Sequence, residues 1–218
     1  MAMIGMQALH GVPDAWPTGH LIRQRFEDAP ISPDQLIDDL TEQLRASQRL
    51  DALPQGARVG VGVGSRGLTN LPRIVRAVVD GLRARGLEPV LMPAMGSHGS
   101  ATPEGQRGVL AEYGITEASM GAVVEADVST EVIGTDAQGH DVHFSSAALH
   151  SVDALIPINR IKLHTDFRGP VESGLCKMLV IGFGKQAGAE STHALGMPAF
   201  TSVVPDRARM ICERVRVP

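Results

Sequence analysis

RVGVGVGSRGLTNLPRIVRAVVDGLRARGLEPVLMPAMGSHG, residues 58–99, is the stretch that decides the fold of this chain. An apolar segment runs through a glycine-rich turn into an amphipathic segment, and a second apolar segment ends in another glycine-rich turn. This order is typical of a strand, a helix and a second strand, and a helical crossover makes the two strands parallel. We therefore predict an α/β fold with a Rossmann-like, mostly parallel sheet, flanking helices and glycine-rich loops at the strand ends. The apolar stripe of the helix comprises Ile74, Val75, Val78, Val79 and Leu82.

The two glycine-rich turns, residues 64–67 and 96–102, follow the carboxyl ends of these strands. Open α/β sheets bind ligands at that edge. In the first turn, Ser65 and Arg66 stand before a helix, so backbone N–H groups, a hydroxyl and a guanidinium can converge on a carboxylate or phosphate. The alternative is that Arg66 forms an ordinary surface ion pair. In the second turn, His98 either caps the turn or contacts a ligand.

The glycine pattern of the first turn is a poor match to a dinucleotide-binding fingerprint. Its glycines, at positions 60, 62, 64 and 67, lie partly inside the predicted strand. No acidic residue stands clearly at the position that would bind a ribose. The pattern therefore predicts an anion site, not a standard NAD site.

Other segments extend this unit in both directions. Residues 21–26 predict a short strand, and residues 32–47 predict a helix that Ser32 caps at its N-terminus. A helix is expected from about Pro103 to Tyr113. Residues 122–150 predict short strands with a turn at 134–140. We treat residues 1–218 as a single α/β domain.

The composition excludes several functional classes. The chain has 218 residues, a net charge of -4 and an aromatic content of 3%, which argues against nucleic-acid binding. Two cysteines, Cys176 and Cys212, are too few for a disulfide framework, and neither a secretion signal nor an apolar run long enough to span a membrane is found. We expect a cytoplasmic protein; its oligomeric state is not predicted. The zinc-protease, zinc-ribbon and serine-hydrolase motifs HExxH, paired CxxC and GxSxG are also absent.

A second informative stretch covers residues 153–196. ALIPINRIKLH, residues 154–164, predicts a strand that ends in polar residues, and an apolar helix carrying Lys177 is expected to start near Pro170. A lysine on such a helix must extend to solvent, pair or react. The end of the strand favours an anionic ligand because it gathers Asn159, Arg160, Lys162, His164 and Arg168.

Several motifs in this order resemble one family. GSHGSATPEGQ, NRIKLHTDFRG with SGLCKML, and GKQAGAESTH are similar to the N-terminal domain of the nickel-pincer lactate racemases, which are nickel-dependent 2-hydroxyacid racemases and epimerases. The resemblance covers roughly residues 15–215. It is more specific than any single glycine pattern because several motifs recur together.

The resemblance implies a role for each matching residue. His98 and His164 match the family's two catalytic histidines, and Lys177 matches the lysine joined covalently to the nickel-pincer nucleotide, a pyridinium mononucleotide whose two sulfur arms hold nickel. His193 matches the remaining nickel ligand. The expected anion-binding residues are Ser65 and Arg66 for the cofactor, and Arg66 and Arg168 for the substrate.

The chain also departs from the family pattern. The turn VGSRGL has Val63 and Gly64 where the family commonly has an acidic residue before the arginine, so polar contacts to substrate or cofactor are expected to differ. Family members have a further C-terminal domain, whereas this chain stops at RMICERVRVP. We expect that domain to be absent, which leaves the activity of this short chain an open question.

The expected reaction accounts for these residue types. Inversion at C2 of a 2-hydroxyacid requires a proton and a hydride to leave and return, and imidazole, with an ordinary pKa of about 6.5, suits the proton transfer. The expected partners are a lactate-like 2-hydroxyacid and the enzymes that build the cofactor. Two alternatives remain: a non-catalytic nucleotide- or phosphate-binding domain, and a hydrolase or lyase that holds one metal ion with His98, His164 and His193.

Overall fold

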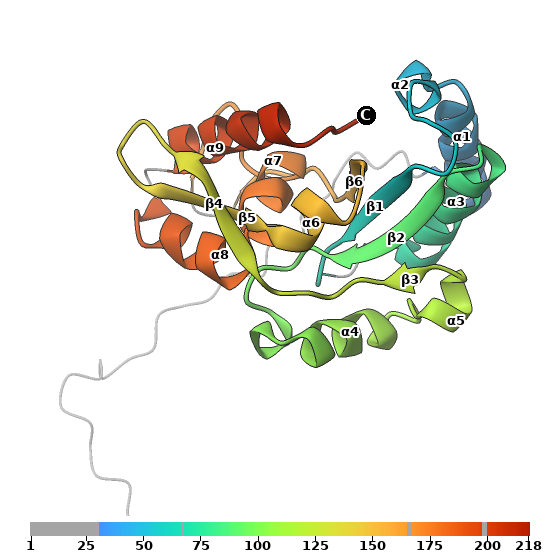
Figure 1. Ribbon diagram of the computed structural model, residues 1–218, viewed down its shortest axis with the longest axis horizontal. Helices are drawn as coiled ribbons and strands as arrows, with labels where there is room; N and C mark the ends of the chain where they lie inside the picture. The colour runs from blue at the N-terminus through green and yellow to red at the C-terminus, as the bar shows by residue number, and fades with distance from the viewer. Residues whose placement is uncertain (1–30, 67, 165–166, 198–199) are drawn as a thin grey trace, which may run out of the picture. The chain divides into compact units, whose positions relative to one another are not determined.

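A four-stranded parallel sheet organises the computed structural model, which describes residues 31–66, 68–164, 167–197 and 200–218 (Figure 1). The strand order is β3-β2-β1-β6. Each strand runs parallel to its neighbours, and Val63 at the end of β1 pairs with Pro93 of β2 and Ile158 of β6. The predicted α/β fold is confirmed. The strands are β1 (Arg58–Val63), β2 (Glu88–Pro93), β3 (Val123–Val124) and β6 (Ala154–Ile158).

Helices cover both faces of this sheet. In Figure 1, α1 and α3 lie on one side of it, and α7, α8 and α9 lie on the other. A separate antiparallel hairpin of β4 and β5 carries the predicted turn. The remaining elements are α1 (Pro33–Arg45), α2 (Gln48–Asp51), α3 (Leu71–Ala84), η1 (Gly99–Ala101), α4 (Pro103–Glu112), α5 (Glu117–Met120), β4 (Thr130–Thr135), β5 (Asp141–Ser145), α6 (Ser146–His150), α7 (Leu175–Lys177), η2 (Met178–Gly182), α8 (Lys185–His193) and α9 (Phe200–Arg214).

The helices predicted at 32–47 and from Pro103 are confirmed. The hydroxyl of Ser32 accepts a hydrogen bond from the N–H of Gln35 and so caps α1. Thr102 caps α4 in the same way. The strand predicted at 21–26 lies outside the described residues.

The glycines of β1 lie where other parts of the chain pack closely on the sheet. The valines of this strand, among them Val61, are buried with α3 on one face of the sheet, and Gly60 and Gly62 face the other. A Cβ atom at Gly62 would lie 2.6 Å from the ring of Phe183, closer than packed atoms approach. Gly62 therefore lets the ring of Phe183 pack directly on the sheet, and Gly60 leaves room for the side chains of Leu155 and Met92 on the neighbouring strands.

A buried ion pair joins the hairpin to the last two helices. Arg207 of α9 is 1% exposed, and its Nε and Nη2 donate to Oδ2 of Asp136, whose side chain is fully buried, at 2.9 and 2.8 Å. Nη1 of Arg207 also donates to Thr192 Oγ1 at 2.9 Å and to Ser191 Oγ at 3.0 Å. One guanidinium thus fixes the end of α8, the helix that carries His193.

Three predictions of secondary structure differ from the structure. Residues 146–150, expected to belong to a region of short strands, form the helix α6, which Ser145 caps. The strand expected at 154–164 ends at Ile158, and the helix expected from Pro170 begins at Leu175. Gly174 immediately before that helix has φ 86 and ψ -138, a backbone conformation that only glycine adopts readily. The helix cannot extend back through it.

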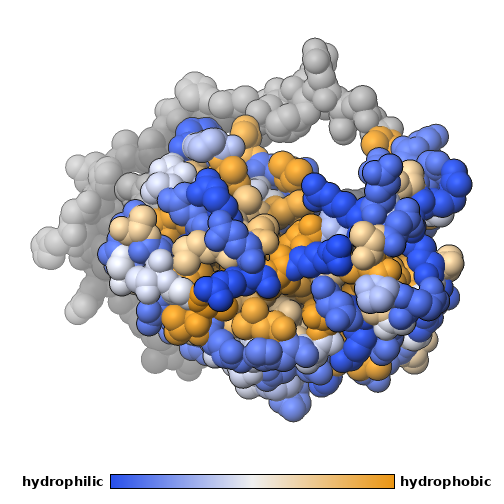
Figure 2. Space-filling view, turned by 45° about the horizontal axis from the view of Figure 1, so that its top comes forward, coloured by the Kyte–Doolittle hydropathy of each residue, from blue (hydrophilic) through white to orange (hydrophobic). Residues whose placement is uncertain are grey.

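Residues 32–218 form one compact unit. Within the described part of the chain, no helix has the length and apolar character needed to cross a membrane. Cys176 and Cys212 are both free thiols. On the face seen in Figure 2, hydrophilic residues predominate toward the outside and hydrophobic residues are visible mainly between them.

Candidate active site

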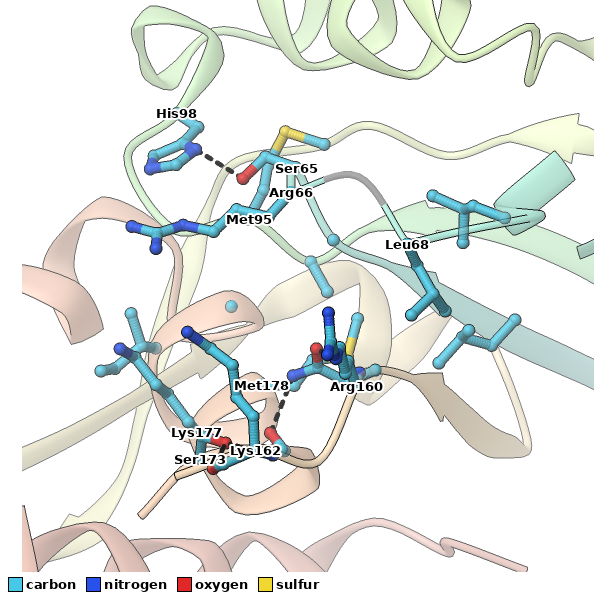
Figure 3. A pocket seen from close by; sticks show the side chains of 18 of the residues that line it. Ser65, Arg66, Leu68, Met95, His98, Arg160, Lys162, Ser173, Lys177 and Met178 are labelled. Carbon is cyan, nitrogen blue, oxygen red and sulfur yellow. Dashed lines mark hydrogen bonds between the residues drawn. The ribbon is translucent and has the colours of Figure 1, made fainter. Parts of the chain in front are cut away.

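A pocket of about 510 Å³ lies at the carboxyl ends of β1, β2 and β6. That is the edge where the sequence places ligand-binding loops, and the volume suits a small-molecule ligand. In Figure 3, Ser65, Arg66 and His98 lie on one wall, and Arg160, Lys162 and Lys177 lie across from them. The predicted site residues that line this pocket are Ser65, Arg66, His98, His164, Lys177 and His193.

The loop that carries His98 is oriented by its neighbours. The ring Nδ1 of His98 lies 2.5 Å from Ser65 Oγ, and the hydroxyl of Tyr113 donates to the carbonyl of Ser65 at 2.8 Å. Although His98 precedes the short helical turn η1, its side chain makes no capping hydrogen bond. Of the two alternatives for this residue, contact with a ligand is the one that the geometry favours.

Two buried residues support the same loop from behind. Nε2 of Gln106 donates to the carbonyls of Gly96 at 3.0 Å and of His98 at 3.3 Å. Nζ of Lys185 donates to Gln106 Oε1 at 3.3 Å and to the carbonyl of Pro93 at 2.7 Å. Burial lowers the pKa of Lys185 to about 8, against the opposing effect of the Asp127 and Glu125 carboxylates. Neither Gln106 nor Lys185 was predicted from the sequence as a site residue.

A row of hydrogen bonds holds the polar segment that follows β6. Nδ2 of Asn159 donates to the carbonyl of Gly174 at 2.9 Å, and the N–H of Lys162 donates to Ser173 Oγ at 3.0 Å. The N–H of His164 donates to Glu172 Oε2 at 2.8 Å. This bond, above all, lowers the pKa of Glu172. The backbone of residues 159–164 is therefore fixed against residues 172–174.

The structure does not bring Arg168 into the pocket lining. Its Nη1 donates to the carbonyls of His164 at 2.6 Å and Phe167 at 3.1 Å, and lies 3.8 Å from Glu172 Oε2. Arg168 supports the loop that carries His164. Its expected contact with substrate is not favoured by this geometry, whereas Arg160 and Lys162 do line the pocket.

His193 occupies the last turn of α8 beside an aromatic group. Its ring centroid lies 5.2 Å from that of Phe200, and the ring of His164 stacks on Phe167 at 4.4 Å. Burial lowers the pKa of His193, and the nearby Lys177 and His164 side chains lower it further. This lowering favours the neutral imidazole, which is the form that binds metals.

The donor set of the pocket restricts the kind of metal site it can form. Over the described ranges, no group of three or more His, Cys, Asp or Glu side chains is placed to hold a metal ion. The alternative in which His98, His164 and His193 share one ion is thus not supported. A metal that brings most of its ligands on a cofactor, and takes one from His193, fits the residues present.

These features define an α/β protein with a basic, histidine-lined pocket at the carboxyl edge of its parallel sheet. Comparisons with protein-family models, with curated proteins and with solved structures find no match for the chain.

Proposed function

We propose that this chain is a racemase or epimerase of a 2-hydroxyacid that uses a nickel-pincer nucleotide attached to Lys177. The observation that carries the proposal is the placement of His98, His164, Lys177 and His193 around one pocket. These residues come from separate segments of the sequence, yet all four line the same volume. The motif resemblance assigns each of them a role in this reaction.

The residues present fit the cofactor. Lys177 offers the amine for the covalent link, and His193, whose pKa is lowered by burial, offers an imidazole nitrogen to nickel. Ser65 and Arg66 follow β1 and are suited to an anionic group. When bound, the cofactor supplies a hydride acceptor for C2 of the substrate. Partner enzymes that build the cofactor are required to supply it.

The side chains of this chain supply the proton transfers. The carboxylate of the substrate pairs with the guanidinium of Arg66. When Nδ1–H of His98 donates to Ser65 Oγ, Nε2 is free to take the proton of the substrate hydroxyl. His164, on the segment after β6, returns a proton when the opposite enantiomer forms. Two histidines are needed because the two enantiomers present their hydroxyls differently.

The cofactor attachment is tested by mass. The protein produced together with cofactor-building enzymes is expected to show a covalent mass increase that maps to Lys177. Lys177→Arg should remove the increase, and Lys162→Arg, which alters a neighbouring lysine of the same pocket, should retain it. An unmodified Lys177 in a protein with full activity contradicts the attachment.

His193→Ala should separate metal binding from attachment. Nickel content is expected to fall at least about tenfold because the only protein ligand proposed for the metal is removed, and the mass increase at Lys177 should persist. His150→Ala is the matched control, since His150 pairs with Glu131 at 2.8 Å and does not line the pocket. Normal nickel in a folded His193→Ala protein, measured by elemental analysis, shows that another group binds the metal.

A further inference from the structure

The pocket carries more positive charge than one substrate carboxylate requires. Arg66, Arg160, Lys162 and Lys177 line it, and no Asp or Glu is among its described lining residues. The proposed function uses Arg66 and Lys177. It leaves Arg160 and Lys162, both exposed, without a role.

Several arginines elsewhere on the surface form ion pairs with acidic side chains. Arg73 pairs with Asp34 at 2.6 Å and Arg76 with Asp80 at 2.8 Å. In contrast, neither Arg160 nor Lys162 has an ion-pair partner within the part of the chain that the structure describes. They stand unpaired in a chain whose net charge is -4. An anionic ligand is the partner that this arrangement favours.

The backbone under both side chains is fixed. The N–H of Arg160 donates to Asn159 Oδ1 at 2.8 Å, and Asn159 is itself tied to Gly174. Ser173 Oγ accepts from the N–H of Lys162 and donates to its carbonyl. The backbone at Arg160 and Lys162 is already ordered before a ligand binds. Binding therefore costs less conformational entropy here than it would on a flexible loop.

The two groups of cations face each other across the pocket. Arg66 follows β1, and Arg160 follows β6, the neighbouring strand. Figure 3 shows Arg66 on the wall of His98, and Arg160 and Lys162 on the opposite wall. A ligand between these walls meets a cation at each end.

We propose that Arg160 and Lys162 bind a second anionic group of the substrate, so that the pocket selects a dicarboxylate 2-hydroxyacid over a monocarboxylate one. This inference rests on the proposed function for its hydroxyacid core. Arg66 pairs with the carboxylate next to C2, and Arg160 with Lys162 pairs with the distal carboxylate. A lactate-like acid would leave the second pair of cations unused.

Calorimetric titration of the protein with two matched acids tests this selectivity. 2-Hydroxybutanedioate and 2-hydroxybutanoate share a four-carbon chain and differ in a terminal carboxylate or methyl group. We expect the diacid to bind about tenfold more tightly, the lower end of what charge-assisted hydrogen bonds give, because the two cations are exposed. The double variant Arg160→Gln/Lys162→Gln should lose this difference and keep its affinity for 2-hydroxybutanoate. Arg49→Gln, which removes an exposed cation of α2 outside the pocket, should keep the difference.

Three outcomes overturn the inference. The first is equal affinity of the unaltered protein for the two acids. The second is a difference that survives in the double variant. In the third, the double variant loses affinity for inorganic phosphate or nicotinic acid mononucleotide but keeps the preference for the diacid. That result assigns the two cations to a phosphate of the cofactor. Failure of the proposed function is detected separately, because the mass of Lys177 does not depend on these titrations.

Discussion

Arg207→Met is expected to lower the free energy of unfolding by about 3–5 kcal/mol, the usual cost of leaving one charge of a buried pair without its partner. Oδ2 of Asp136 would lose both of its hydrogen bonds from the guanidinium. Its Oδ1 would keep those from the N–H groups of Gln138 and His140. The carboxylate would therefore remain buried with half of its partners. Urea denaturation measures the change.

Two further variants isolate the ion pair. Arg209→Met removes an exposed arginine of the same helix, paired with Asp206 at the surface, and should change stability by less than about 1 kcal/mol. Asp136→Asn in the Arg207→Met background should recover part of the loss, because it removes the uncompensated charge. A loss below about 1 kcal/mol in Arg207→Met alone would show that the pair is not a structural support.

Acidic pH should reduce the difference in stability between the unaltered protein and Arg207→Met. Burial raises the pKa of Asp136, but the hydrogen bonds from the His140 N–H and Arg207 outweigh it and the pKa lies below its ordinary value. A carboxyl group whose pKa is lowered in the folded state contributes stability above its unfolded pKa, about 3.9, and loses it as the pH falls through the folded pKa. The deficit of Arg207→Met should therefore be constant near neutral pH and shrink in acid.

The central part of the fold could be predicted because local patterns there agree with the tertiary structure. In residues 58–99 the apolar period changes from strand to helix and back, and only a parallel pair satisfies that order. Gly86, which follows the end of α3, has φ 71; its N–H donates to the carbonyl of Arg83 at 2.8 Å, and the N–H of Leu87 donates to the carbonyl of Leu82 at 3.0 Å. Each of these signals lies within a few residues of the structure it specifies.

Contacts between distant residues left no such signal. Asp136 and Arg207 are 71 positions apart, and Asp136 in the sequence is one more acid in a polar turn. Lys185 and Gln106 likewise meet across 79 positions. The glycines of β1 likewise gave no sign of their neighbours, which are the ring of Phe183 at Gly62 and the side chains of Leu155 and Met92 at Gly60.

The candidate site was predictable in part for a topological reason. Loops after parallel strands meet at one edge of the sheet, so Arg66, His98 and His164 could be expected to converge. The side-chain directions could not be predicted. Arg168 stands only four residues after His164, yet its guanidinium binds carbonyls of its own loop, whereas Arg160 and Lys162 line the pocket.

His98→Ala and His164→Ala are each expected to lower the racemisation rate of the nickel-loaded protein by about 10²–10⁴-fold, the range for loss of a general acid or base. Both changes should leave nickel content near normal, because neither residue is proposed to bind the metal. Sustained racemisation requires both histidines. Each histidine exchanges the hydroxyl proton of one enantiomer, so the catalytic cycle cannot be completed when either is missing.

The controls distinguish proton transfer from support of the pocket. Ser65→Ala removes the hydroxyl 2.5 Å from Nδ1 of His98 and should give a smaller loss, since the imidazole is kept and only its orientation is relaxed. His140→Ala, which changes an exposed histidine of the hairpin outside the pocket, should keep the full rate. More than about a tenth of the original turnover in His98→Ala or His164→Ala contradicts an essential acid–base role, since that role is worth at least about a hundredfold. Such a result would direct attention to Arg66 and Lys177 as the groups that act on the substrate.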